Sequence, residues 1–379
     1  MRPVFYKNAR IFTKDFTFQN GGFAVDENGC FQNVLSADIP ADAVDLQGAT
    51  VIPGLVDVHI HGAMGHDFSD GDADGLKAIS AYLAKEGITA FAPASMTLPY
   101  ETLEKAYAVA KDFSKSASAN CARLMGIHME GPYFSEKKKG AQNGAYLKTP
   151  DFAGFEKLYK DCDGLIAIAD VAPELPGAEE FVRQASKLCT VSVAHTDSDY
   201  DHAKAAFSAG ATHLTHLFNA MPGIHHRTPG VIPAAVENKN VRAELICDGM
   251  HVHPASVRLA FSMFGADRMV LISDALRCLG MPDGEYELGG QQVFLSNNLA
   301  KLADGTVAGA ATNLYAGMCN AMAFGIGEAD AVRAATYNPA CAIGADKKIG
   351  SIENGKLADF IVCSADYTQK RVFLGGNEL

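Results

Sequence analysis

The segment at residues 51–62, VIPGLVDVHIHG, constrains the fold of this chain more than any other stretch. An apolar pair ends at Pro53-Gly54, and the apolar run that follows carries Asp57, His59 and His61. If that run is a β-strand, residues two apart share a face, so these three polar side chains point the same way. The apolar positions between them fit a strand that is covered on both faces, as in a parallel sheet.

Two imidazoles at the C-terminal end of such a strand form a candidate metal site. Neutral imidazole is a ligand for zinc, iron and other transition metals. The alternative is a surface strand on which His59 and His61 are incidental. We favour the metal-binding interpretation of this pattern.

After residue 55 the chain repeats a unit of strand, loop and helix. Leu76, Ile79 and Leu83 form one apolar helix face, and Gly87 ends that helix. Repeated β/α units of this length indicate an α/β protein, with a parallel sheet closed into a (β/α)8 barrel of the TIM type. The predicted strands span residues 55–60, 88–94, 124–130, 165–171, 190–195, 211–217, 241–247 and 269–273. The predicted helices span residues 72–86, 100–116, 178–188, 199–209, 254–264, 312–324 and 328–337.

Two stretches near the N-terminus and one late in the chain predict β-structure without helices. Residues 4–6 and 9–12 are predicted to form one hairpin, and residues 21–25 the next strand. Residues 284–302 interrupt the β/α rhythm as a polar β excursion, because apolar and polar side chains alternate there.

The two ends of the chain are expected to combine outside the barrel. Residues 350–363 are β-like again, and we expect them to pair with the N-terminal strands in a small β-sandwich. The predicted domains are therefore a β-sandwich from residues 1–53 plus 345–379 and a barrel from residues 54–344.

Charge and cysteine content limit the partners and the compartment. The net charge of −12 argues against a nucleic-acid partner, whose phosphates require a basic surface. Nine cysteines are dispersed without CxxC pairs, which is typical of reduced thiols in the cytoplasm. The N-terminus lacks the apolar core of a signal peptide, and no apolar run is long enough to span a membrane. We predict a cytoplasmic protein without nucleic-acid or membrane partners.

Polar residues gather where the predicted barrel strands end, which is where barrel enzymes place catalytic groups. His195 alone would more often be a core histidine, and Asp274 alone could cap a helix. Their coincidence with imidazoles and carboxylates at successive strand ends predicts a metal site. The residues at these positions are His59, His61, His128, Glu130, His195, His213, His216, Asp248, His251 and Asp274.

The chain resembles the amidohydrolase superfamily of metal-dependent hydrolases and, within it, the family of N-acetylglucosamine-6-phosphate deacetylases. The resemblance covers nearly the whole chain. The motifs that carry it are PGLVDVHIHG at 53–62, HMEGPY at 128–133, KKKGAQN at 137–143, VAHTDS at 193–198, THLFNAMPGIHHRTPG at 215–230, CDGMHV at 247–252, SDAL at 273–276, GTVAGA at 305–310 and GSIENGKLADFIV at 350–362.

The resemblance implies a ligand set and a reaction. It implies that Glu130 bridges two metal positions, one completed by His195 and His216, the other by His59 and His61 with Asp274. One or two divalent ions per subunit are expected, and zinc and iron both accept these ligands. The implied reaction is hydrolysis of the acetamido group of N-acetylglucosamine 6-phosphate to glucosamine 6-phosphate and acetate.

In that reaction Asp274 is the expected catalytic residue. It would accept a proton from the attacking water and return it to the departing amine. The metal would activate the water and polarise the carbonyl.

The resemblance also implies residues that bind the amino sugar phosphate. Arg227 would bind the phosphate, because guanidinium forks onto phosphate oxygens, and would reach the neighbouring active site of a homodimer. Many family members have histidine where this chain has Gln142, which can donate a hydrogen bond but cannot carry positive charge. The expected substrate-binding residues are Ala141, Gln142, Asn219, Ala220, Arg227, Asp248, Gly249, Met250, His251, Val307, Ala308 and Gly309.

Two other functions fit the same barrel. One is a different amide or cyclic-amide hydrolase of the superfamily, which would normally use a lysine where Glu130 stands or have different substrate loops. The other is a non-catalytic barrel kept for binding or assembly, which should have lost metal ligands or Asp274. The sequence retains every expected ligand, and its HLFNAM and DGMHV motifs favour the deacetylase.

Overall fold

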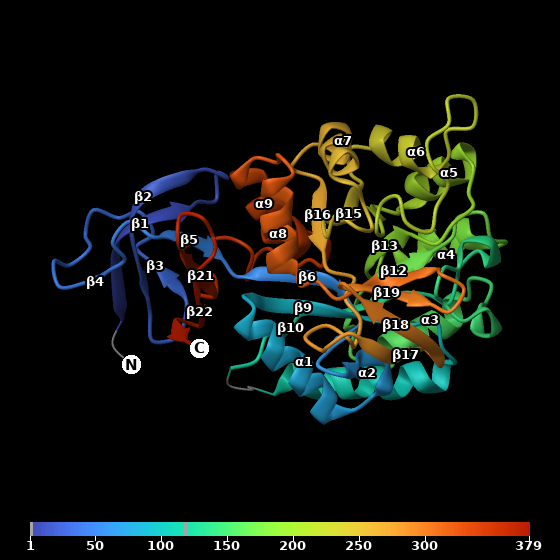
Figure 1. The fold of residues 1–379 in the computed structure, drawn as a ribbon, viewed down its shortest axis with the longest axis horizontal. Coiled ribbons are helices and arrows are strands. Elements are labelled where there is room, and N and C mark those ends of the chain that lie inside the picture. The colour runs from blue at the N-terminus through green and yellow to red at the C-terminus, as the bar shows by residue number, and fades with distance from the viewer. Residues whose placement is uncertain (1–2, 117–119) are drawn as a thin grey trace.

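The computed structural model describes residues 3–116 and 120–379, so the first two residues of the predicted N-terminal β segment lie outside it. Two large sheets organise these residues (Figure 1). One is a parallel barrel surrounded by helices, and the other is a mixed sheet built from both ends of the chain.

The predicted (β/α)8 barrel is confirmed. Its strands lie in the order β6-β9-β11-β12-β13-β14-β15-β16, all parallel to their neighbours, and each overlaps one of the predicted strands. A short strand, β10 (Arg123–Leu124), also pairs with β9. The barrel strands are β6 (Leu55–Ile60), β9 (Ile88–Ser95), β11 (Ile127–Met129), β12 (Ile166–Val171), β13 (Thr190–Val193), β14 (His213–Leu214), β15 (Arg242–Ile246) and β16 (Met269–Ile272).

The seam between the last strand and the first is closed by backbone hydrogen bonds beyond the strand ends. The N–H of Asp274 donates to the carbonyl of His59, and the N–H of His61 donates to that of Ala275, both at 2.9 Å. These bonds place the end of β16 beside His59, in β6, and His61, just after it.

The helices cover the outside of the barrel. In α1 the apolar face formed by Leu76, Ile79 and Leu83 is buried, and Asp72 caps the helix by accepting from the N–H groups of Asp74 and Gly75. The helices are α1 (Ala73–Lys85), α2 (Tyr100–Lys115), α3 (Phe152–Asp161), α4 (Ala178–Ala185), α5 (Tyr200–Ala209), α6 (Val231–Glu237), α7 (Pro254–Phe264), α8 (Leu314–Ala323), α9 (Glu328–Ala335) and α10 (Tyr337–Ala342).

Three of these helices, α3, α6 and α10, were not predicted from the sequence. Helix α6 is seven residues long and carries Pro233 in its first turn, where a missing N–H costs no helical hydrogen bond. Helix α10 has six residues and follows α9 after Thr336 alone. Segments this short span less than two turns and show no clear apolar period.

The terminal sheet joins both ends of the chain, as predicted, in the strand order β23-β22-β21-β5-β1-β2-β3 with β4 paired to β1. The division into domains at residues 53/54 and 344/345 stays a prediction. The strands are β1 (Val4–Phe12), β2 (Phe18–Val25), β3 (Phe31–Gln32), β4 (Val44–Asp45), β5 (Thr50–Pro53), β21 (Phe360–Cys363), β22 (Lys370–Leu374) and β23 (Asn377–Glu378).

One local prediction in this sheet was wrong. Residues 4–6 and 9–12 form a single strand, β1, whose antiparallel partner is β2. The register shifts between Tyr6 and Ala9, and Asn8 has a φ of 55°. The break in the pattern is therefore a β-bulge and not a hairpin turn.

The polar excursion forms a separate four-stranded antiparallel sheet, one strand longer than predicted. Its strands are β17 (Gly284–Leu288), β18 (Gln291–Ser296), β19 (Leu299–Leu302) and β20 (Val307–Ala310). The N–H of Leu276 donates to the carbonyl of Ala310, which ties β20 to the end of β16. Gly309 allows this contact, because a Cβ there would lie 3.0 Å from the Asp274 carbonyl oxygen. A two-stranded hairpin, β7 (Gly62–Ala63) and β8 (His66–Asp67), follows β6.

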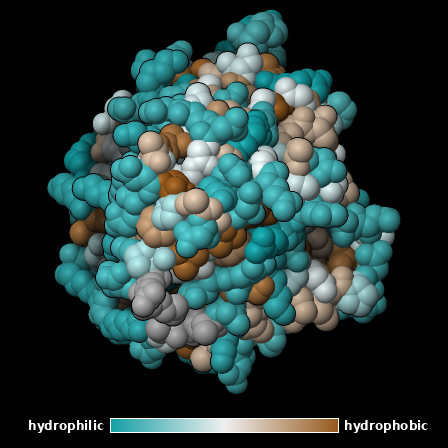
Figure 2. Space-filling model, turned by 90° about the vertical axis from the view of Figure 1, so that its left-hand side faces the viewer, coloured by the Kyte–Doolittle hydropathy of each residue, from teal (hydrophilic) through white to brown (hydrophobic). Residues whose placement is uncertain are grey.

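The surface and the cysteines agree with the composition. Figure 2 views the end that carries the terminal sheet, where hydrophilic side chains cover most of the face and smaller hydrophobic patches lie between them. None of the nine cysteines forms a disulfide. Among the described residues, no helix has both the length and the apolar character needed to cross a membrane.

Candidate active site

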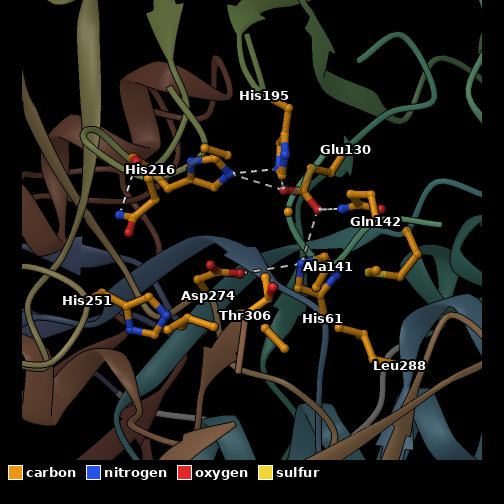
Figure 3. A pocket seen from close by; sticks show the side chains of 16 residues that line it. His61, Glu130, Ala141, Gln142, His195, His216, His251, Asp274, Leu288 and Thr306 are labelled. Carbon is orange, nitrogen blue, oxygen red and sulfur yellow. Dashed lines mark hydrogen bonds and ion pairs between the residues drawn. The ribbon is translucent and has the colours of Figure 1, made fainter. Parts of the chain in front are cut away.

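A pocket opens at the C-terminal ends of the barrel strands, partly beneath the β17–β20 sheet (Figure 3). Its volume, including space open to solvent, is about 690 Å³. The residues that line it are His61, Met96, Glu130, Gly140, Ala141, Gln142, His195, His216, Asn219, Ala220, His251, Asp274, Leu288, Thr306, Val307 and Ala308.

The first polar cluster in the pocket joins Glu130, His195 and His216. Oε1 of Glu130 lies 3.0 Å from His195 Nε2 and 3.3 Å from His216 Nε2. The two imidazole nitrogens are themselves 3.1 Å apart. Figure 3 shows the two rings and the carboxylate converging on one point. This cluster unites the ends of three separate strands, as the sequence predicted.

The second cluster joins His59, His61 and Asp274. Nε2 of His61 lies 3.4 Å from Asp274 Oδ1 and 3.3 Å from Oε2 of Glu130. Nε2 of His59 lies 3.5 Å from the same Asp274 oxygen. Oε1 of Glu130 contacts the first cluster and also lies 3.6 Å from His59 Nε2, whereas Oε2 faces His61, so the carboxylate lies between the two clusters.

Three of these residues adopt backbone conformations that are unfavourable for residues other than glycine. The φ angles are 42° at His195, 30° at His216 and 48° at Asp274. Such angles cost about 1–3 kcal/mol each and concentrate at functional sites. Each lies just beyond a barrel strand, where the positive φ accompanies a side chain that lines the pocket.

The charged groups in the pocket shift one another's pKa values. Burial by itself would raise the pKa of Glu130, but hydrogen bonds from His195, His216 and His61 hold that pKa well below its ordinary value. Burial likewise opposes ionisation of Asp274, yet the charges of His59 and His61 lower its pKa. Burial lowers the pKa of His216, and Glu130 more than compensates, raising it to about 9. The site therefore combines ionised carboxylates with imidazoles whose protonated form is stabilised by those carboxylates.

These donors fit a divalent cation. His195 Nδ1 donates to the carbonyl of Lys138 at 2.9 Å, so Nε2, which faces Glu130 and His216, is the nitrogen that would offer a lone pair to an ion. Ligands around a tetrahedral zinc ion lie roughly 3.3 Å apart, because each Zn–N bond is about 2.0 Å. The second cluster has a buried atom without a hydrogen-bond partner, His59 Nε2, which faces two carboxylates. The two clusters together thus form a candidate metal centre.

A layer of buried polar side chains lies below this centre, inside the barrel. His128 is held at both ring nitrogens, 2.9 Å from the carbonyl of Val58 and 3.0 Å from Asp170. Both partners only accept, so both nitrogens donate and the ring is charged. Burial lowers the pKa of His128, but Asp170 and Glu244 outweigh it and raise the pKa to about 9. His128 then has no lone pair for a metal, so the cluster that it forms with His59 and Glu244 does not fit one.

The structure brings many of the expected substrate-binding residues into the pocket and leaves others outside its lining. Those that line it are Ala141, Gln142, Asn219, Ala220, His251, Val307 and Ala308. Those that do not are Arg227, Asp248, Gly249, Met250 and Gly309.

Gln142 contacts the first cluster directly. Its amide donates to Oε2 of Glu130 at 2.6 Å, and its Oε1 accepts from the N–H of Thr97 at 2.8 Å. Because the Thr97 backbone fixes the carbonyl oxygen, the nitrogen of the amide is the end that faces Glu130 and the pocket. A histidine at this position would lack the acceptor oxygen that holds Gln142 in place.

Asp248 and Arg227, two of the expected residues that do not line the pocket, have defined contacts elsewhere. Asp248 accepts from His251 Nδ1 at 2.6 Å and so orients that ring toward the pocket. Arg227 is exposed on a loop, where Nη1 lies 2.8 Å from His226 Nε2. Within one chain Arg227 does not reach the pocket, and its predicted role across a dimer stays a prediction.

The sequence analysis missed several residues of the site. Four further residues line the pocket and were not among the expected substrate-binding residues, although two of them, Gly140 and Thr306, lie inside the KKKGAQN and GTVAGA motifs. They are Met96, Gly140, Leu288 and Thr306. Glu244 of β15 and Asp170 of β12 belong to the buried layer. A charged residue inside an otherwise apolar strand is a signal that could have identified these two, because an unpaired buried charge is costly.

The comparison with protein families gives one match over most of the chain. The model of the amidohydrolase family matches residues 50–379. The chain belongs to the amidohydrolase family. The amidohydrolase match begins just before β6 and includes every residue of both clusters.

Individual relatives are similar over nearly the full length. An N-acetylglucosamine-6-phosphate deacetylase of Vibrio furnissii is 36% identical over 363 residues, which cover 94% of this chain and 90% of the relative. An N-acetylgalactosamine-6-phosphate deacetylase of Escherichia coli O157:H7 is 31% identical over 341 residues, covering 89% and 90%.

A solved amidohydrolase structure has nearly the same fold. It is a mutant N-acetyl-D-glucosamine-6-phosphate deacetylase of Mycobacterium smegmatis in complex with N-acetyl-D-glucosamine-6-phosphate. The TM-score is 0.92 at 29% identity, and the match covers 100% of this chain and 99% of the other.

Proposed function

We propose that this amidohydrolase removes the acetyl group of N-acetylglucosamine 6-phosphate, giving glucosamine 6-phosphate and acetate. The observation that carries the proposal is Glu130 placed between two histidine clusters, with Asp274 beside them, at the base of the pocket. The deacetylases to which the chain is similar over its whole length support this substrate.

The two clusters are the proposed metal ligands. Glu130, His195 and His216 would hold one divalent ion, zinc or iron, and His59, His61 and Asp274, with Glu130 shared between the clusters, would hold a second. When bound, such an ion lowers the pKa of water and polarises a carbonyl.

Asp274 is the proposed proton carrier. Its carboxylate accepts the proton of the water that attacks the acetamido carbon, and then delivers that proton to the nitrogen as the C–N bond breaks. Oδ1 lies 3.4 Å from His61 Nε2 and 3.5 Å from His59 Nε2, so two buried rings hold it at the pocket base. One residue can thus serve as base and then as acid.

The rest of the pocket would hold the sugar. His251, oriented by Asp248, and the amide of Gln142 are the polar groups available for hydroxyl and carbonyl oxygens. Asn219, Ala220, Val307 and Ala308 shape the walls. Arg227 of one subunit of a homodimer would reach the active site of the other subunit and bind the phosphate there. The enzyme would act in the cytoplasm.

The rival functions make different demands. Another amide or cyclic-amide hydrolase would normally use a lysine where Glu130 stands or have different substrate loops. A non-catalytic barrel would have no need for three strained backbone positions around buried carboxylates. An N-acetylgalactosamine 6-phosphate deacetylase is a specific second candidate, because one relative carries that name.

Acetate release by the purified protein tests the proposal. N-acetylglucosamine 6-phosphate should give acetate and glucosamine 6-phosphate in equal amounts, and metal analysis of the same sample should find at least one divalent ion per chain. N-acetylgalactosamine 6-phosphate and unphosphorylated N-acetylglucosamine are the matched controls for the sugar and the phosphate.

Several outcomes would contradict the proposal. Faster release from the galactose isomer would favour the second candidate. Hydrolysis of a cyclic amide without acetate release would favour another amidohydrolase. A metal-free protein that releases no acetate would favour the non-catalytic barrel.

A further inference from the structure

We propose that Glu244 is a positioning residue that holds histidines of both metal clusters. The inference rests on the proposed metal-dependent function, because it assigns a role toward the ligands named there. Glu244 lies on β15, below the pocket, and its side chain is fully buried.

A single oxygen of Glu244 contacts both clusters. His59 Nδ1 donates to Oε2 of Glu244 at 2.9 Å. The backbone N–H of His216 donates to the same oxygen at 3.1 Å. His59 belongs to the second cluster and His216 to the first, so one carboxylate oxygen connects them.

The bond to His59 determines which ring nitrogen is free. A carboxylate only accepts, so Nδ1 of His59 carries the proton and Nε2 carries the lone pair of the neutral ring. Nε2 is the atom that faces Asp274 and Glu130 and has no hydrogen-bond partner. Carboxylates behind metal-bound histidines fix the tautomer and the orientation of the ring in this way.

The bond to His216 acts on the backbone. His216 has a φ of 30°, and the next residue, Leu217, donates its N–H to the carbonyl of Glu244 at 2.9 Å. The side chain and the main chain of Glu244 therefore both hold the turn that directs His216 into the pocket. A strained conformation persists only where its surroundings fix it.

Asp170 provides a matched control. It is also a fully buried carboxylate of the layer below the pocket, and it accepts from His128 Nε2 and from the Thr215 hydroxyl, both at 3.0 Å. It contacts none of the proposed ligands. Replacing either carboxylate by its amide removes one buried charge and keeps the volume.

The experiment compares Glu244→Gln and Asp170→Asn with the wild type in zinc affinity. Each metal-stripped protein is titrated with zinc alone in competition with a chromophoric chelator, and unfolding is followed by circular dichroism. Glu244→Gln should weaken zinc binding by about 10- to 100-fold, the range for lost partners of metal-bound histidines. Asp170→Asn should lower stability and leave zinc affinity close to the wild type.

Equal zinc affinity in Glu244→Gln and the wild type would overturn the inference. So would equal losses in the two variants, because loss of buried charge alone would then explain the effect. If the wild type itself binds neither zinc nor ferrous iron, the proposed function fails, and this outcome is distinct from a failure of Glu244 alone.

A measurement on the wild type avoids any folding defect of the variants. In zinc-loaded protein with ¹³C- and ¹⁵N-labelled histidine, the ring signals of His59 report which nitrogen binds metal. The signals are assigned by their absence in a His59→Asn sample. We expect zinc on Nε2 and a proton on Nδ1. Zinc on Nδ1 would contradict the role of Glu244.

Discussion

The terminal sheet and the barrel turn different kinds of side chain into their interiors. In the terminal sheet, the buried positions of β1, β2 and β21 hold Tyr6, Phe23 and Phe360. Phe360 stacks on Phe373 with ring centroids 4.4 Å apart and an interplanar angle of 6°. At the mouth of the barrel, the buried positions hold imidazoles and carboxylates.

The difference separates stability from chemistry. Aromatic rings contribute hydrophobic burial and about 0.5–1.5 kcal/mol per pair beyond it. The barrel mouth instead buries charges, which cost free energy unless they are paired. We infer that the terminal sheet chiefly stabilises the chain, whereas the barrel mouth gives up stability to hold reactive groups in place.

Among the changes that test this contrast, replacement of Asp274 is expected to have the largest effect on turnover. Asp274→Asn keeps the size of the side chain and removes its ability to accept a proton. We expect kcat to fall at least ~100-fold, the lower end for a general acid–base group, while stability changes little. Steady-state acetate release and thermal unfolding on one preparation measure the two quantities.

Metal analysis is the control for that variant, since metal should remain at His195 and His216. Near-normal turnover with metal in place would remove Asp274 from the mechanism. Loss of all metal would make Asp274 chiefly a ligand.

The opposite result is expected in the terminal sheet. Phe360→Ala removes a fully buried ring from the aromatic core and should lower the free energy of unfolding by about 3–5 kcal/mol. The folded fraction should keep the kcat and KM of the wild type, because the residue contacts no part of the pocket. Val44→Ala, at an exposed position of the same sheet, is the matched control for denaturant unfolding. A large fall in kcat for folded Phe360→Ala would contradict the division between the two regions.

A smaller effect is expected from Arg227, which lies outside both regions. Losing a charged hydrogen-bonding partner costs about 1.5–3 kcal/mol, so Arg227→Ala should lower kcat/KM for the phosphorylated sugar roughly 10- to 100-fold. The loss for unphosphorylated N-acetylglucosamine should be much smaller. Equal losses on both sugars would mean that Arg227 does not bind the phosphate.

Mixing variants tests whether Arg227 acts across subunits. In a heterodimer of Arg227→Ala and Asp274→Asn chains, one active site would have an intact Asp274 and an intact Arg227 from the other chain. Activity of the mixture should therefore exceed that of either variant. No gain after subunit exchange would place Arg227 outside the neighbouring site.

The sequence predicted the barrel well because its strands carry strong local signals. β6 and β9 are buried at every position, and most of their residues are apolar. Helix α7 was predicted with its observed bounds, since Pro254 begins it and Gly265 follows it. The terminal β1 strand was split in error, because a bulge and a turn both favour a residue with positive φ, such as Asn8.

The ligands of the two candidate metal clusters could be predicted from the sequence. The residues that hold those ligands in place and complete the pocket could not. The predicted ligands lie at strand ends, where the topology of a barrel brings them together. They are His59, His61, Glu130, His195, His216 and Asp274. The role of Glu244 depends on which atoms its side chain reaches across the barrel, and strand periodicity does not specify this. The loop positions of Met96 and Thr306 depend on how the excursion sheet folds over the mouth.

The most direct test of the account is metal removal from the wild-type protein. Chelation should abolish acetate release from N-acetylglucosamine 6-phosphate, and adding back zinc or ferrous iron should restore it in proportion to the metal bound per chain. The far-ultraviolet circular dichroism should stay unchanged throughout, because the terminal sheet and the barrel strands do not depend on the ion. Full turnover by protein shown to be metal-free would contradict a metal centre at Glu130, His195 and His216.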